Sequence, residues 1–141
     1  MFITNHVLAG AAIGSQLPFT KALVAGFASH LAMDNLPHWG VTGPLPLTIA
    51  KRDGVIGMVG IALCTAVASP ARRPGVLAGI FGACLPDTDK LGEHFGNGSP
   101  WPQKFDDFHS WLQREAPHRM PHEMLAGVGL LTLAVLLGRP S

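Results

Sequence analysis

Apolar residues along this chain gather into five segments, separated by glycine, proline and charged residues. The segments span about residues 4–15, 18–36, 53–69, 74–85 and 121–138, and their lengths favour helices. Pro18 suits the first turn of a helix in the second segment. Pro37 ends that helix, because the residue before a proline is disfavoured in the helical conformation. Because the chain is long enough for one core, the pattern predicts an all-α fold in a single domain, residues 1–141.

The composition changes this picture from a soluble bundle to a membrane protein. Hydrophobic residues make up 48% of the chain and charged residues 13%, with a mean hydropathy of +0.30, whereas a soluble domain carries roughly 25% charged residues. We therefore expect a compact polytopic helical bundle embedded in the lipid bilayer. Only the second and fifth segments approach the roughly 20 residues that cross a hydrocarbon core. A net charge of +1 and the absence of a basic run argue against nucleic acid as a partner.

Small residues recur at the spacing of helix contacts, as in the pairs Gly10 and Gly14, and Gly75 and Gly79. A third series consists of Gly54, Gly57 and Gly60. In lipid, such residues allow two helix backbones to approach closely. The pattern predicts close packing between the helices.

If the five segments alternate in direction, all seven histidines and all nine carboxylates lie at one end of the bundle. The connections at the opposite end carry no acid but have the basic residues Lys21, Arg72, Arg73 and Arg139. By the positive-inside rule we expect that basic end in the cytoplasm, and the acidic, histidine-rich end on the extracytoplasmic side of a bacterial plasma membrane. Imidazole and carboxylate gathered in one place are typical of a Zn, Mn or Fe site.

A short amphipathic helix is predicted between residues 101 and 112. Phe105, Phe108, Trp111 and Leu112 recur at intervals of three and four residues, opposite charged and amide side chains. We expect this helix to lie at the membrane interface with its aromatic face down. The alternative is a lid that packs against its own bundle. Both arrangements hold His109 over the end of the bundle that carries the acids.

Two motifs supply the strongest candidate metal ligands. His30, Asp34 and His38 are spaced at i, i+4 and i+8, so the first two share one helix face. A carboxylate inside an apolar segment is costly unless it is paired or coordinated, although His30 and Asp34 could simply form a hydrogen-bonded pair that fixes a helix end. Asp87 and Asp89 follow the fourth segment and could flank a divalent ion. Their alternative role is an Asx-type turn or a helix N-cap.

The last motif contains His118 and His122 at i, i+4, with Glu123 beside them. Glu123 is a candidate general acid or base, or a first-turn carboxylate that favours a helix N-terminus. Arg119 is a candidate for binding an anionic substrate oxygen, or for pairing with a neighbouring glutamate. His6, which opens the first segment, faces the same end and joins the candidate ligands, whereas His94 has no role in this pattern.

The chain resembles the YdjM-type membrane-bound metal-dependent hydrolases, a family of small polytopic proteins distantly similar to zinc-dependent phospholipase C. The residues that support the resemblance are 4–10 (Thr-Asn-His-Val-Leu-Ala-Gly), 29–39 (Ser-His, Asp34 and Pro-His-Trp) and 85–90 (Leu-Pro-Asp-Thr-Asp-Lys). The family's later motif, His-Arg-x-x-Thr-His-Ser, is one residue shorter here and lacks Thr and Ser at residues 118–123. His109 is therefore an alternative source of the late histidine.

The resemblance implies metal-activated hydrolysis of a phosphoester or a lipid head group, with zinc as the expected metal and manganese or iron as alternatives. The expected ligands are His6, His30, Asp34, His38, Asp87, Asp89, His109 and His122. A different hypothesis is a non-enzymatic membrane subunit whose His/Asp cluster is structural or binds a structural metal. A third, a metal or proton conduit, requires ionisable residues deep within the spans.

Overall fold

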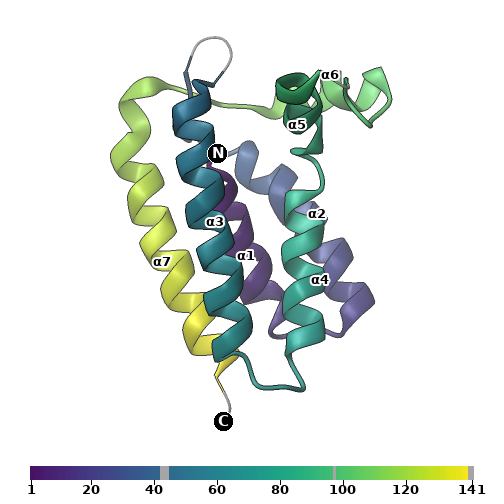
Figure 1. Cartoon of the computed structure of the whole chain (residues 1–141), viewed down its shortest axis with the longest axis vertical. Coiled ribbons are helices and arrows are strands. Elements are labelled where there is room, and N and C mark those ends of the chain that lie inside the picture. Colours follow the sequence, from purple (N-terminus) through teal and green to yellow (C-terminus); the bar gives the residue numbers. More distant parts are fainter. Residues whose placement is uncertain (42–44, 97, 140–141) are drawn as a thin grey trace.

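The first helix, α1 (Ile3–Gly14), lies inside a bundle and is buried from Asn5 to Ala12. It is contacted by α2 (Phe19–Asp34), α3 (Leu47–Val67), α4 (Arg73–Cys84) and α7 (Met120–Gly138). Two shorter helices, α5 (Thr88–Phe95) and α6 (Gln103–Leu112), lie at one end, and a 3-10 turn (Pro117–Arg119) precedes α7 (Figure 1). This computed structural model describes residues 1–41, 45–96 and 98–139, and every regular element in those ranges is helical.

Close contact between α1 and α4 depends on the predicted glycine pairs. A Cβ added to Gly10 would lie 2.5 Å from the Gly79 carbonyl oxygen, and one added to Gly14 would meet the Gly75 carbonyl in the same way. The pairing runs in opposite directions along the two helices, so α1 and α4 are antiparallel. The third series differs, because a Cβ added to Gly57 or Gly60 would make only ordinary van der Waals contacts with α1, and one added to Gly54 would meet nothing within 4 Å.

The first turn of α1 is capped by carboxylates from two other helices. Asp53 of α3 accepts hydrogen bonds from the amides of Ile3 (2.7 Å) and Thr4 (3.1 Å), and Glu123 of α7 accepts one from the Phe2 amide (2.7 Å). The amides at a helix start have no partner within the helix and attract negative charge. These two acids therefore fix α1 between α3 and α7.

Several helix boundaries differ from the predictions. The expected bundle of about five helices plus an amphipathic one misses α5, which occupies a segment expected to be a loop. Helix α3 begins at Leu47 and not near Asp53, and Asp53, in its second turn, accepts hydrogen bonds from the start of α1. Helix α2 ends at Asp34 after 16 residues, or roughly 24 Å, and falls short of the predicted span.

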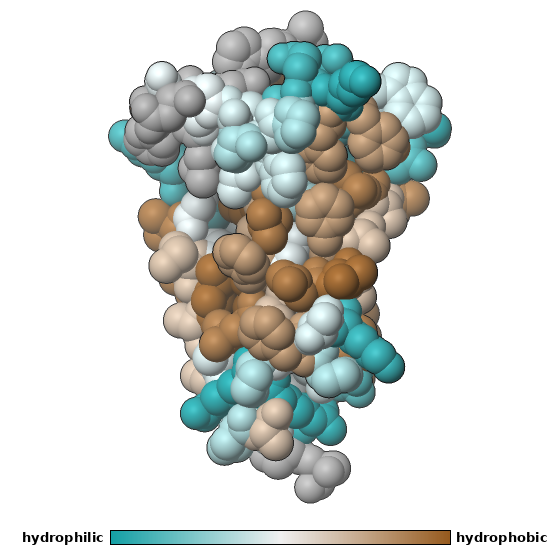
Figure 2. All heavy atoms as spheres, turned by 90° about the vertical axis from the view of Figure 1, so that its right-hand side faces the viewer, coloured by the Kyte–Doolittle hydropathy of each residue, from teal (hydrophilic) through white to brown (hydrophobic). Residues whose placement is uncertain are grey.

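One helical stretch in the described part of the chain, residues 117–138, is long and apolar enough to cross a membrane. Most of this stretch is exposed, unlike the core helix of a soluble protein. Large apolar side chains are also exposed on other helices, including Val24 of α2, Val55 and Met58 of α3, and Phe81 of α4. Figure 2 shows an apolar belt around the middle of one face, with hydrophilic residues gathered above and below it.

Candidate metal centre

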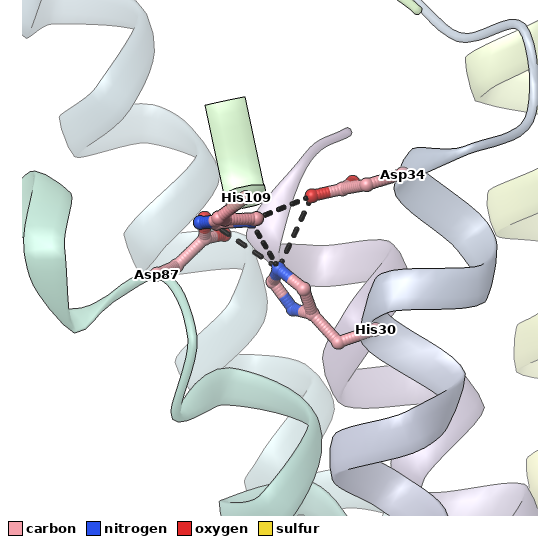
Figure 3. Close-up of side chains that lie close together, drawn as sticks. All are labelled: His30, Asp34, Asp87 and His109. Atoms are coloured by element: carbon pink, nitrogen blue, oxygen red, sulfur yellow. Dashed lines mark hydrogen bonds and ion pairs between the residues drawn. The ribbon is translucent and has the colours of Figure 1, made fainter. Parts of the chain in front are cut away.

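Four side chains from three parts of the chain converge at the end of the bundle near α5 and α6. His30 and Asp34 lie on the last two turns of α2, Asp87 lies between α4 and α5, and His109 comes from α6. One donor atom from each lies within 4.8 Å of the other three, and Figure 3 shows the side chains turned toward a common point. His30 and Asp34 are 0% exposed and His109 is 1% exposed.

The distances between these donors match the size of a small divalent ion. Ligands about 2.1 Å from a tetrahedral metal lie roughly 3.4 Å from one another. His30 Nε2 lies 3.1 Å from Asp34 Oδ2, 3.1 Å from His109 Nε2 and 3.7 Å from Asp87 Oδ1. His109 Nε2 lies 3.1 Å from Asp34 Oδ2 and 4.0 Å from Asp87 Oδ1. The two imidazoles and two carboxylates could therefore hold a metal ion.

The orientation of both imidazoles suits metal binding. His30 Nδ1 lies 2.7 Å from the Ala83 carbonyl oxygen and must donate to it, because a carbonyl can only accept. His109 Nδ1 likewise donates to Asp89 Oδ2 at 3.1 Å. In the neutral form of each imidazole, Nε2 is then left with its lone pair toward the centre, which is the arrangement that outer partners impose on metal-binding histidines. Two such lone pairs 3.1 Å apart require a cation or a shared proton between them.

The charges around the cluster favour a cation at its centre. Burial opposes the charged form of His109, but hydrogen bonds to Asp34 and Asp89 outweigh burial and raise the pKa of this imidazole to about 9. Burial also opposes ionisation of Asp87, yet the charge of Lys90 favours it and the pKa of Asp87 is lowered to about 2. Lys90 Nζ lies 2.7 Å from Asp87 Oδ1. Both carboxylates and a positive charge are thus present at neutral pH.

His6 lies beside the four-residue group. Its ring stacks on that of His30 with centroids 3.8 Å apart, and its Nε2 lies 3.2 Å from Asp34 Oδ1. Neither ring nitrogen of this fully buried side chain forms a hydrogen bond of acceptable geometry within the described structure. Asp34 Oδ1 therefore faces His6 and the Met1 amine, which donates to it at 3.2 Å, whereas Oδ2 faces the pair His30 and His109.

Three other predicted ligands lie outside the group. Asp89 contacts it only through His109 Nδ1, as an outer partner. His38 is buried but donates from Nδ1 to the Leu36 carbonyl and places its Nε2 3.2 Å from Gln113 Oε1. His122, at the start of α7, is exposed to solvent.

Neither predicted catalytic residue joins the group. Glu123 is 2% exposed, and its carboxylate accepts hydrogen bonds from the Phe2 amide, the Asn5 side chain (2.9 Å) and the Trp39 amide (3.2 Å). These contacts hold α7 against α1 and the segment after α2. Arg119 donates to the Arg114 carbonyl and fixes the turn before α7.

The sequence prediction missed two polar partners of the group, the Met1 amine and Gln113. Gln113 donates from Nε2 to Asp34 Oδ2 at 2.8 Å. Its position four residues after His109 was the available signal, since i and i+4 share a helix face. The side chains of Glu93 and His94 lie outside the described residues.

The fold and the site together define an all-helical bundle with a buried His/Asp cluster that could hold a metal ion. Comparison of the chain with protein-family models, curated proteins and solved structures found no match.

Proposed function

We propose that this protein is embedded in a membrane and binds a divalent metal ion through His30, Asp34, Asp87 and His109 to hydrolyse a phosphoester. The observation that supports this most directly is the convergence of two imidazoles and two carboxylates within 4.8 Å. The side chains of His30 and Asp34 are fully buried. Buried carboxylates are costly unless they are paired or coordinate a metal.

Several surface features support the membrane location. The apolar belt of Figure 2 and the exposed side chains of α7 would meet lipid rather than water. On α6, Trp111 (77% exposed) and Phe108 (45% exposed) point outward, as expected of an interfacial helix, whereas Leu112 packs inward as in the lid alternative. The basic residues at the opposite end support an extracytoplasmic site in a bacterial plasma membrane.

The donor set supports zinc as the ion, because two nitrogen and two oxygen ligands at tetrahedral separations suit it. Manganese and iron remain alternatives, since both accept mixed imidazole and carboxylate ligands. A bound ion of this kind lowers the pKa of water toward about 7 and stabilises charge on phosphoryl oxygens. A lipid head group is the favoured substrate, because the site lies at the end of an apolar belt.

The test is metal analysis and phosphodiesterase assay of the detergent-solubilised protein. We expect bound zinc, and hydrolysis of bis(p-nitrophenyl) phosphate or of a phospholipid in mixed micelles. Asp34→Asn and Asp87→Asn should remove both while the circular dichroism spectrum stays helical. Asp107→Asn, an exposed residue of α6, is the matched control and should change neither. Protein without bound transition metal, and with the same thermal stability in chelator, would contradict the proposal.

A second candidate function is a non-enzymatic membrane subunit with a structural metal. The observation that favours it is the number of protein donors, since four side chains fill a tetrahedral shell, as in structural zinc sites. In that case the protein would bind zinc, lose thermal stability in chelator and hydrolyse neither substrate. Hydrolysis that disappears in Asp34→Asn would decide for the enzyme.

A further inference from the structure

Helix α6 is held to the bundle by few buried side chains. Among its ten residues only His109 and Leu112 are buried, whereas Phe108 and Trp111 are exposed. Its aromatic contact with the bundle is formed by Phe105, whose ring centroid lies 6.0 Å from that of Phe27 on α2. In Figure 1, α6 lies above the upper ends of α2 and α4, next to α5. Elements with so little buried apolar surface open at low cost in free energy.

The chain that follows α6 is, in contrast, firmly attached to the end of α2. The Arg114 amide donates to the Asp34 carbonyl (3.3 Å), the His38 amide donates to the Arg114 carbonyl (3.2 Å), and the Ala116 amide donates to the His38 carbonyl (3.0 Å). None of these backbone bonds involves a residue of α6. Gln113, where α6 ends, is therefore the point about which the helix would swing.

Three of the four candidate ligands belong to or directly follow the packed helices of the bundle, and the fourth belongs to α6. His30 and Asp34 belong to α2, and Asp87 directly follows α4, which packs closely on α1 and α2. His109 is the one member of the group that α6 brings. With all four in place, a tetrahedral ion has no position left for a substrate, whereas catalytic sites use three protein ligands and keep the fourth open.

We infer that His109 is an exchangeable ligand and that α6 is the cover of the site. His30, Asp34 and Asp87 retain the ion while α6 swings outward about Gln113 and takes His109 with it. The position that His109 leaves is then open to the attacking water or to an anionic substrate oxygen. This inference rests on the proposed metal site, but its tests measure metal retention and backbone exchange and do not depend on hydrolysis.

The first test uses Co(II) alone as the probe and compares two single-ligand variants. His109→Ala should keep one Co(II) per chain, and added imidazole should restore the visible spectrum of the wild type by filling the vacated position. His30→Ala should lose Co(II). Retention in both variants, or equal loss in both, overturns the inference. Wild-type protein that binds no Co(II) instead refutes the proposed metal site itself. His109→Gln, which keeps a polar group on α6, guards against loss of fold in the alanine variant.

The second test measures amide hydrogen exchange in the wild-type protein. The amides of residues 105–112 should exchange at least about tenfold faster than those of residues 26–34 in α2, because α6 opens without unfolding of the bundle. Saturating Co(II) should slow exchange in α6, since the ion binds His109, and leave α2 unchanged. Exchange in α6 as slow as in α2, or unaffected by Co(II), overturns the inference.

Discussion

Gly79 of α4 lies so close to the carbonyl oxygen of Gly10 of α1 that no room remains for a β-carbon. We therefore expect Gly79→Ala to separate α1 from α4 and to lower the free energy of unfolding by roughly 1–3 kcal/mol, the usual cost of overpacking. Thermal or denaturant unfolding in detergent measures this. The matched control is Gly54→Ala in α3, where a Cβ meets nothing within 4 Å. Equal stability of the two variants would refute the close contact.

Asp53 should be important for stability and unimportant for metal binding. Its carboxylate accepts hydrogen bonds from the Ile3 and Thr4 amides and from the Thr4 hydroxyl (2.6 Å). Asp53→Asn replaces one carboxylate oxygen with an NH₂ group, which cannot accept these hydrogen bonds. We therefore expect a loss of roughly 1–3 kcal/mol in the free energy of unfolding. Zinc content should stay at the wild-type level. Loss of zinc without loss of stability would instead make Asp53 part of the metal site.

Asp89 should tune the affinity for the metal without being required for binding. It touches the cluster only through His109 Nδ1, and loss of such an outer partner typically costs about 10–100-fold in metal affinity. Asp89→Asn should show this reduction in a competition titration against a chelator of known affinity, with Asp107→Asn as the unaffected control. Complete loss of metal would assign Asp89 to the direct ligands.

Metal affinity should rise with pH. Because the pKa of His109 is about 9, the imidazole is protonated at pH 7 and must lose its proton to bind an ion. Chelator competition should show affinity increasing about tenfold per pH unit up to pH 9 and levelling off above it. A pH-independent affinity between pH 7 and 9 would show that His109 does not bind the ion.

The same proton should stabilise the metal-free protein. The pKa of His109 is raised above its ordinary value of 6.5, so its contribution to stability is complete below pH 6.5 and disappears as the pH rises through 9. The thermal unfolding temperature of chelator-treated protein should fall across this range. Gln replaces the imidazole with a group that does not titrate, so His109→Gln should remove that pH dependence.

The apolar segments predicted most of the fold because each of them forms a helix that packs into the bundle. Helix α5 escaped prediction because its eight residues mix charge, glycine and histidine without an apolar run. The sequence did offer Gly96 as a signal for the end of this helix, since glycine is common at helix C-caps. In the structure Gly96 caps α5 with a positive φ of 78°.

The candidate site was predictable where its ligands are near one another in the sequence. His30 and Asp34 share one helix face, and Asp87 follows a segment that returns to the same end. Spacing could not separate His109, in the last turn of α6, from His122, in the first turn of α7, because both lie at that end of the bundle. It also could not reveal that Glu123 caps α1, since its partners Phe2 and Asn5 are 121 and 118 residues away.

The capping of α1 by α3 and α7 has a consequence for the order of assembly. The amides of Ile3 and Thr4 gain their acceptor only when Asp53 packs against them. The Phe2 amide gains its acceptor only when Glu123 does so, and Glu123 lies 121 residues later in the chain. Contacts this distant in sequence form late, because the entropy of closing long loops must be overcome first. Helix α1 is therefore among the last elements to be fixed, and its buried His6 becomes ordered only when α7 packs against it.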